Sequence, residues 1–185
     1  MVGTPRATRG WFTLPPPHNP AGAPVALNTP DDTDPVDQLE RWIQQNGIDA
    51  DVMRFDTSCH SVADAVAATG AGIEAIVKNL CMIADDGDLI VAILPGAERA
   101  STTRVGKALE MPPPRMATAD EVLARSGYPA GGTPSFGFSA RFVVDPQVMD
   151  RDIVYTGGGS DRALVRIAPS ELLRANAATV ARVRK

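Results

Sequence analysis

Residues 76–94 read IVKNLCMIADDGDLIVAIL, two apolar runs separated by a short polar segment. Each run is short, apolar and rich in β-branched residues, which is typical of a strand buried on both faces of a sheet. The polar segment, residues 85–88, has the composition of a tight turn between antiparallel strands. The sequence therefore predicts a buried β-hairpin.

One residue of this hairpin is unusual, because Lys78 lies inside the first apolar run. Burying an unpaired ammonium group is costly unless the group finds a partner or its pKa falls. A lysine in such a strand either extends its aliphatic stem to the surface or works in a cleft. The strand alone leaves both interpretations open.

Helix and strand signals do not alternate strictly along the rest of the chain. Capping residues predict helices that begin after Asp34, Ser61 and Thr118, and another that starts at Ser101 or Thr102. A further short helix is expected at Pro169. Other strands are expected at residues 52–55, 142–144, 153–155, 164–167 and 180–183, and Asp145-Pro146 is expected to form a turn. We therefore predict an α+β fold with a mixed or largely antiparallel sheet.

The first part of the chain differs in composition from the rest. It contains many prolines, and its apolar residues follow no regular period. We predict a Pro-rich N-terminal extension over residues 1–33 and one folded domain over residues 34–185. Trp11, Phe12 and Leu14 could attach the extension to the domain or to a partner chain.

The overall composition excludes several classes of protein. The 185 residues include 18 Lys and Arg against 22 Asp and Glu, so a nucleic-acid partner would need a local basic patch. No apolar stretch approaches the ~20 residues that cross a bilayer. Three prolines at residues 15–17 also interrupt the only candidate signal peptide, and we expect a cytoplasmic protein.

The side chains give little support for a nucleophile–base pair, a metal site or a nucleotide-binding motif. Cys59 and His60 are neighbours in the sequence, which does not by itself create the geometry of a nucleophile and its base. No spacing supplies the three or so ligands that a catalytic zinc needs. The chain also lacks a phosphate loop and a dinucleotide fingerprint, so we expect neither a metal nor another cofactor.

Two glycine-rich loops are more informative. Residues 131–132 and 157–159 each follow an expected element, and glycine lets a backbone approach a ligand closely. Successive N–H groups there could bind an anion or an oxyanion, although each loop alone is also compatible with a simple turn. Together with Lys78, the loops suggest a site that stabilises developing negative charge with backbone donors and one cation.

Seven short motifs occur in an order and spacing that resemble one known family. They are HS (60–61), IVKNL (76–80), AILPG (92–96), KAL (107–109), GGTPSFG (131–137), VD (144–145) and YTGGGS (155–160). From about residue 36 to its end, the chain resembles the YbaK/ProX family of editing domains. The resemblance implies a barrel-like mixed β-sheet flanked by helices, and a metal-free ester hydrolase that deacylates mischarged aminoacyl-tRNA.

The resemblance also implies roles for individual residues. Lys78 would be the functional side chain, with Gly131 and Gly132 contributing backbone donors. The implied substrate-binding residues are His60, Asn79, Thr133, Pro134, Ser135, Phe136, Gly137, Gly158, Gly159 and Ser160. Ser135 stands where the family often has a second proline, so this loop could recognise its substrate differently.

The resemblance leaves two substrates open, Cys-tRNA(Pro) and Ala-tRNA(Pro). Lys78-Asn79 resembles the branch that clears alanyl-tRNA, whereas residues 157–160 resemble the YbaK-like branch associated with cysteinyl-tRNA(Pro). The implied partners are the acceptor end of aminoacyl-tRNA and prolyl-tRNA synthetase.

Three basic residues, Arg99, Arg104 and Lys107, are candidate tRNA contacts near or on one expected helix. The alternative for them is a solvated helix face. The alternative for the whole protein is a non-catalytic module that binds a tRNA end or a synthetase without hydrolysis.

Overall fold

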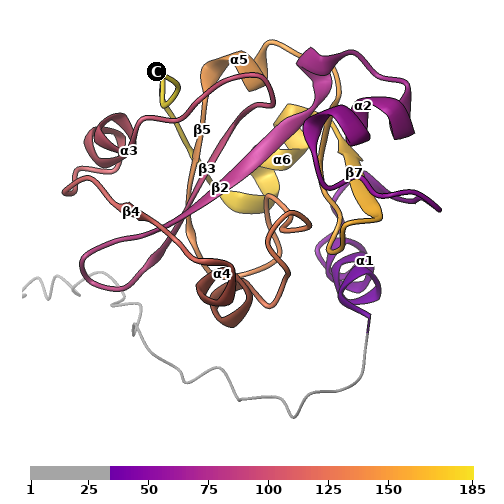
Figure 1. The fold of residues 1–185 in the computed structure, drawn as a ribbon, viewed down its shortest axis with the longest axis horizontal. Coiled ribbons are helices and arrows are strands. Elements are labelled where there is room, and N and C mark those ends of the chain that lie inside the picture. Colours follow the sequence, from indigo (N-terminus) through magenta and orange to yellow (C-terminus); the bar gives the residue numbers. More distant parts are fainter. Residues whose placement is uncertain (1–33) are drawn as a thin grey trace, which may run out of the picture. The chain divides into compact units, whose positions relative to one another are not determined.

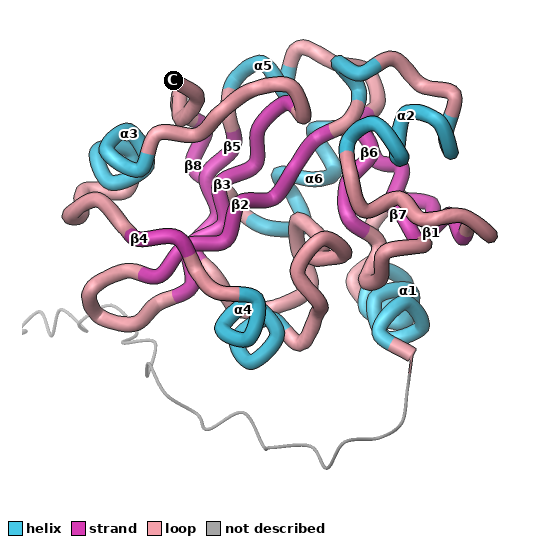
Figure 2. The backbone as a smooth tube through the Cα atoms, viewed as in Figure 1, coloured by secondary structure: helices cyan, strands magenta, loops and turns pink. Residues whose placement is uncertain are grey.

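A computed structural model describes residues 34–185 (Figures 1 and 2). The predicted extension over residues 1–33, with Trp11, Phe12 and Leu14, lies outside the described residues, and its boundary stays a prediction. The helices are α1 Pro35–Gln45, α2 Val62–Thr69, α3 Thr102–Ala108, α4 Ala119–Ser126, α5 Pro146–Met149 and α6 Pro169–Asn176, with a 3-10 turn at Ile73–Ala75.

The strands form two sheets. One has the order β1-β7-β6 and is antiparallel, with β1 Ala50–Arg54, β6 Val154–Gly157 and β7 Ala163–Ile167. The other has the order β4-β2-β3-β5-β8, with β2 Val77–Ile83, β3 Leu89–Pro95, β4 Arg115–Met116, β5 Arg141–Val144 and β8 Thr179–Val180. An isolated parallel bridge between Ile76 and Tyr155 joins the sheets where β2 begins.

The predicted hairpin is confirmed as β2 and β3, which pair antiparallel around the turn at residues 85–88. Residues 89–94 of β3 are all buried, because alternate side chains enter two apolar clusters: Leu89, Val91 and Ile93 pack in one, and Ile90 and Ala92 in the other. The first half of β2 is only half-buried, so Lys78 and Asn79 are not enclosed on both faces as the sequence suggested. This partly open stretch of β2 provides room for a site.

The predicted helix starts are confirmed, and each follows from local chemistry. Ser61 and Thr118 both form capping boxes, with Asp64 and Glu121 respectively. One prediction was wrong, because Asp145-Pro146 begins the short helix α5 instead of forming a simple turn. The Asp145 carboxylate accepts the amide of Gln147, and proline suits the first helical position.

The predicted fold class is confirmed as α+β, with a mixed sheet flanked by helices. The β3–β5 and β5–β8 pairs are parallel, whereas β2 pairs antiparallel with both β3 and β4. Within residues 34–185, both sheets are open and neither closes into a barrel. In the same range no helix combines the length and apolar character needed to cross a membrane.

Candidate functional site

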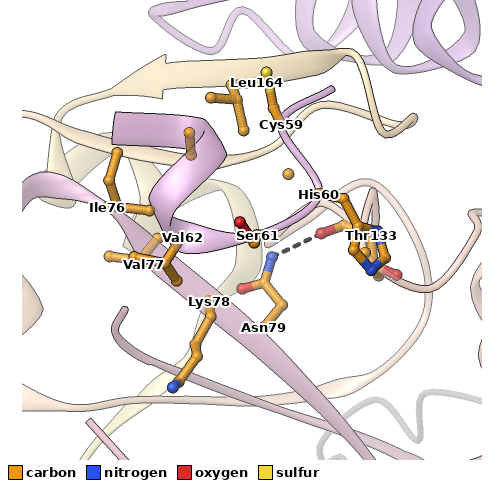
Figure 3. A pocket seen from close by; sticks show the side chains of 13 residues that line it. Cys59, His60, Ser61, Val62, Ile76, Val77, Lys78, Asn79, Thr133 and Leu164 are labelled. Carbon is orange, nitrogen blue, oxygen red and sulfur yellow. Dashed lines mark hydrogen bonds between the residues drawn. The ribbon is translucent and has the colours of Figure 1, made fainter. Parts of the chain in front are cut away.

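A cavity of about 110 Å³ lies beside the start of β2, between α2 and the two glycine loops (Figure 3). This volume is several times the ~10–15 Å³ that a single water requires. Its lining residues come from segments far apart in the sequence. They are Cys59, His60, Ser61, Val62, Ala65, Ile76, Val77, Lys78, Asn79, Gly131, Thr133, Gly157 and Leu164.

The walls of this cavity have two characters. One end is apolar and is formed by Cys59, Ala65, Ile76 and Leu164, which pack together as a small buried cluster. The polar part of the wall is formed by residues that include Lys78, Asn79, Gly131 and Thr133. The cavity therefore suits a small molecule or group with an apolar end and a polar end.

Lys78 is half-buried, and its Nζ donates a hydrogen bond to the Gly96 carbonyl at 2.9 Å. Burial is the main cause that lowers the pKa of Lys78 below its ordinary value. The positive charge of Arg99 lowers this pKa further, and Glu98 partly opposes the effect. In Figure 3 the ammonium group points away from His60 and Thr133, so reaching the loop backbone would require a change of rotamer.

Asn79 uses its amide to hold the 131–137 loop against two strands. Its Nδ2 donates to the Thr133 carbonyl at 2.8 Å and to Thr156 Oγ1 at 2.9 Å. Its Oδ1 accepts from Ser135 Oγ at 2.7 Å. Because both N–H groups are occupied within the protein, Asn79 positions the loop more than it offers donors to a ligand.

The hydroxyl groups complete a closed ring of hydrogen bonds. Ser135 has one hydroxyl hydrogen and gives it to Asn79, so Thr156 must donate in the 2.6 Å contact between the two hydroxyls. Thr156 in turn accepts from Asn79, and every bond of the ring runs in one direction. Ser135 and Thr156 are fully buried, where such cooperative networks are strong and incomplete ones are costly.

Asn176, at the end of α6, extends this network by donating to the Ser135 carbonyl at 3.0 Å. A proline at position 135 would have no hydroxyl for the ring. The serine that departs from the family pattern therefore connects the loop to β2 and β6 through its hydroxyl group. Thr156 belongs to the YTGGGS motif, but sequence reasoning assigned it no role. The sequence contained no signal for Asn176.

The two glycine loops lie directly against each other. A Cβ on Gly157 would stand 2.2 Å from the Thr133 oxygen, and one on Gly132 would stand 2.6 Å from the Ser160 carbonyl carbon. The Gly159 amide donates to the Gly132 oxygen at 2.8 Å. These glycines are needed because one backbone passes against the other.

Hydrogen bonds within and between the loops decide which loop amides are available to a ligand. Gly132 and Gly158 donate to the carbonyls of Pro129 and Ala163, each at 3.0 Å, and Gly159 is also occupied. The amides of Gly131 and Thr133 have no acceptor within residues 34–185. Both residues line the cavity, so they, and not Gly132, present the candidate oxyanion donors.

Several predicted site residues do not line this cavity. Phe136 is fully buried and stacks on Trp42 of α1, with ring centroids 5.5 Å apart. Gly137 lies under the same helix, where a Cβ would be 3.3 Å from Leu39 Cδ1. The other residues in this group are Gly132, Pro134, Ser135, Gly158, Gly159 and Ser160.

The candidate tRNA contacts lie outside the cavity and differ from one another. Arg99 is exposed and near enough to Lys78 to affect its pKa. Lys107 is exposed on α3. Arg104 is half-buried and donates to the Arg184 carbonyl, so its guanidinium has a structural role.

The cysteines are poorly suited to nucleophilic attack. Burial is the main cause that raises the pKa of the Cys59 thiol, and the carboxylates of Asp64 and Asp161 raise it further. Burial likewise raises the pKa of Cys81 to about 11. Because thiolate is the reactive form, both side chains act as small apolar groups here. Within the described part of the chain, no three His, Cys, Asp or Glu residues are grouped to hold a metal.

A second cavity of about 160 Å³ shares Asn79, Gly131 and Thr133 with the first. Its other walls are mostly apolar and are formed by Cys81, Met116, Ala117, Val122 and Ala130. The loop backbone at residues 131–133 therefore contributes to two adjoining cavities of different character.

Comparison with known proteins points to one family. The family model for the aminoacyl-tRNA editing domain matches residues 56–175, more than half of the chain. The crystal structure of hypothetical protein APE2540 has a TM-score of 0.74 and 32% sequence identity, covering 80% of this chain and 99% of that chain. The crystal structure of a "putative trans-editing enzyme for prolyl tRNA synthetase" has a TM-score of 0.76 and 26% identity, covering 83% and 98% respectively. Uncharacterized protein YwhH of Bacillus subtilis (strain 168) is 25% identical over 134 residues, 71% of this chain and 82% of its own length.

Proposed function

Because the chain belongs to the aminoacyl-tRNA editing domain family, we propose that it hydrolyses the ester bond of a mischarged aminoacyl-tRNA. The family match confirms the resemblance to the YbaK/ProX family that the motifs indicated. The proposed substrates are Cys-tRNA(Pro) and Ala-tRNA(Pro), edited in the cytoplasm after mischarging by prolyl-tRNA synthetase. The neighbouring structure named as a trans-editing enzyme for that synthetase supports this choice.

The observation that carries the proposal is the combination of one cation and two unused amides around one small cavity. Lys78 is half-buried and uses one of its three ammonium hydrogens on Gly96. Gly131 and Thr133 have amides without acceptors among the described residues. Groups of this kind, preorganised and partly shielded from water, stabilise the oxyanion of an ester under attack.

In the proposed reaction, the ester carbonyl oxygen accepts hydrogen bonds from the amides of Gly131 and Thr133. The Lys78 ammonium group exchanges the Gly96 carbonyl for the same oxygen. Negative charge that develops on this oxygen then faces three N–H donors. Removing one oxyanion donor typically raises a barrier by about 3 kcal/mol, so the arrangement can accelerate hydrolysis without a side-chain nucleophile.

The nucleophile in this proposal is a water molecule oriented by a hydroxyl of the terminal ribose. Its oxygen bonds to the carbonyl carbon, the ester bond to the ribose oxygen breaks, and a proton from the water passes to that leaving oxygen. The products are the free amino acid and uncharged tRNA. With a cysteinyl substrate, the side-chain thiol can attack instead, and its proton passes to the ribose oxygen as a thiolactone forms.

Selection would depend on the apolar end of the cavity. The apolar lining at Ala65, Ile76 and Leu164 favours a methyl or thiol side chain over a charged one. One methylene changes discrimination by only about 1–3 kcal/mol, so exclusion of larger residues must come from contact with these walls.

The terminal adenosine is assigned in this proposal to the second cavity, across the 131–133 backbone. That cavity has small side chains at Ala117 and Ala130, and the half-exposed Met116 in its lining could contact an aromatic base. An ester that joins the two groups would then cross the loop at Gly131, where the donors lie.

A panel of mischarged tRNAs tests the function directly. The wild-type protein should release cysteine or alanine from tRNA(Pro), and Lys78→Ala should slow release by about 10²–10³-fold. Unfolding curves of Lys78→Ala would show whether the fold is intact. Binding of the tRNAs without any release would instead support the non-catalytic module.

A further inference from the structure

Four exposed basic residues lie on α3 and on the segments that the fold brings beside it. They are Arg99, Lys107, Arg182 and Lys185, here called the basic face. Arg182 and Lys185 are far from the other two in the sequence, and sequence reasoning did not select them. The chain as a whole has a net charge of −4, so this group of positive charges is opposite in sign to the net charge of the protein.

The C-terminal segment is held beside the start of α3 by backbone pairing (Figure 1). The Ser101 amide donates to the Val183 carbonyl at 2.8 Å, and the Lys185 amide donates to the Arg99 carbonyl at 2.7 Å. Arg104 adds its bond to the Arg184 carbonyl. The four cations therefore belong to one rigid part of the surface.

The same segment is fixed from below by a buried carboxylate. Asp145 is fully buried, pairs with the Arg184 guanidinium, and accepts the amides of Val183 and Arg184 at 3.0 and 3.2 Å. The positive charge of Arg184 is therefore neutralised by Asp145. The exposed charges beside it are left facing outward.

A groove of about 500 Å³ separates α3 from the C-terminal segment. It is lined by the basic residues Arg104, Lys107 and Arg182 and by the small residues Ala108 and Ala181. Within residues 34–185, none of the four residues of the basic face makes an ion pair. The acidic residues near them in the sequence are Glu98 and Glu110, and the buried Asp145 is paired with Arg184, so the four cations outnumber the unpaired carboxylates of this stretch.

The basic face continues to the edge of the candidate site. Gly96 accepts the hydrogen bond from Lys78, and Arg99 is three residues further along the same loop. Arg99 is also close enough for its charge to act on Lys78. A polyanion lying on the basic face could thus present its end at the cavity.

We infer that the basic face binds the phosphodiester backbone of an RNA whose terminal nucleotide enters the candidate site. This inference rests on the proposed function, because the site identifies the bound end as an aminoacyl ester. The exposed lysine and arginines contact phosphates without reading sequence, whereas the cavities select the aminoacyl group. Arg104 acts as a positioning residue that keeps the C-terminal segment in place.

The test compares the full-length double variant Lys107→Gln/Arg182→Gln with wild type, using uncharged tRNA as the probe. Each lost phosphate contact should reduce the slope of log affinity against log salt by about 0.7–0.9. The double variant should therefore lose about 1.4–1.8 of that slope. With mischarged tRNA its KM should rise while kcat stays at the wild-type value.

A matched control is Arg41→Gln/Arg151→Gln, which removes two other exposed arginines, one of them on the distant α1 (Figure 1). The control should keep the wild-type salt slope. A short aminoacyl-adenosine ester distinguishes the two proposals, because the Lys107/Arg182 variant should hydrolyse it at the wild-type rate. If the Lys107/Arg182 variant kept the wild-type salt slope and KM on tRNA, the proposal that the basic face binds RNA would be overturned, even if Lys78→Ala had abolished hydrolysis. Equal losses in the control and the test variant would overturn it as well.

Discussion

Ser135 Oγ lies 2.7 Å from Asn79 Oδ1, although 56 positions separate the two residues in the chain. With Thr156 they form a ring in which each group donates once to the next. The ring fixes the orientation of the Asn79 amide, and its second N–H holds the Thr133 carbonyl. The loop amides that face the cavity are therefore placed by a network and not by the loop sequence alone.

Thr156→Val should show the cost of opening this ring. Valine keeps the shape of threonine but leaves an Asn79 N–H without an acceptor and Ser135 without its donor. Each unsatisfied buried group costs about 1–3 kcal/mol, so the free energy of unfolding should fall by at least that amount. Urea unfolding measures the loss. Thr156→Ser is the control, since it keeps the hydroxyl and should retain both the ring and the activity. Equal stability of the two variants would contradict the ring.

Lys78→Met should change how stability depends on pH. Since the folded-state pKa of Lys78 is lowered, the unfolded chain binds more protons between that value and the ordinary 10.5. The stability contributed by Lys78 therefore rises with pH in this window, and the penalty is fully present below it. Relative to Lys78→Met, the wild type should gain stability as the pH increases from 7 toward 10.5. A pH-independent difference between the unfolding free energies of the two proteins would contradict a lowered pKa for Lys78 in the folded state.

Gly157→Ala should separate the two glycine loops. The added methyl would lie 2.2 Å from the Thr133 oxygen, and its three nearest atoms are all backbone atoms of residues 132–133, which cannot rotate away as a side chain could. Overpacking of this kind costs about 1–3 kcal/mol, and the displaced loop should also lose deacylation activity. Gly72→Ala is the control, because its Cβ would meet only the flexible end of Glu74. Chemical denaturation and deacylation rates measured on both variants check the expectation.

Val62→Ala should widen the first cavity, which Val62 lines from the start of α2. Esters with a side chain one or two methylenes larger should then be hydrolysed better relative to alanyl and cysteinyl esters. The expected change in the ratio of kcat/KM values is about 10–200-fold per methylene. A ratio that does not move would show that this cavity does not hold the amino-acid side chain.

The elements that could be predicted from the sequence are those whose signals are local. The hairpin, with its two apolar runs and acidic turn, and the capping boxes at Ser61 and Thr118 depend on residues within a few positions of one another. Asp145-Pro146 was misjudged because the same dipeptide suits both a turn and a helix start. The Gly159 amide could not be identified as occupied, because its acceptor, the Gly132 carbonyl, lies on the other glycine loop.

By itself, the sequence determined the α+β class, the position of an unusual lysine in a strand, and the family to which the motifs belong. Only the tertiary structure decided how Asn79 and Ser135 are used, and that Arg182 lies across a groove from Lys107. The physical reason is that hydrogen bonds and charge interactions act over a few ångströms, whatever the separation along the chain. Local patterns specify the elements, but their packing determines which polar groups are satisfied and which remain available to a ligand.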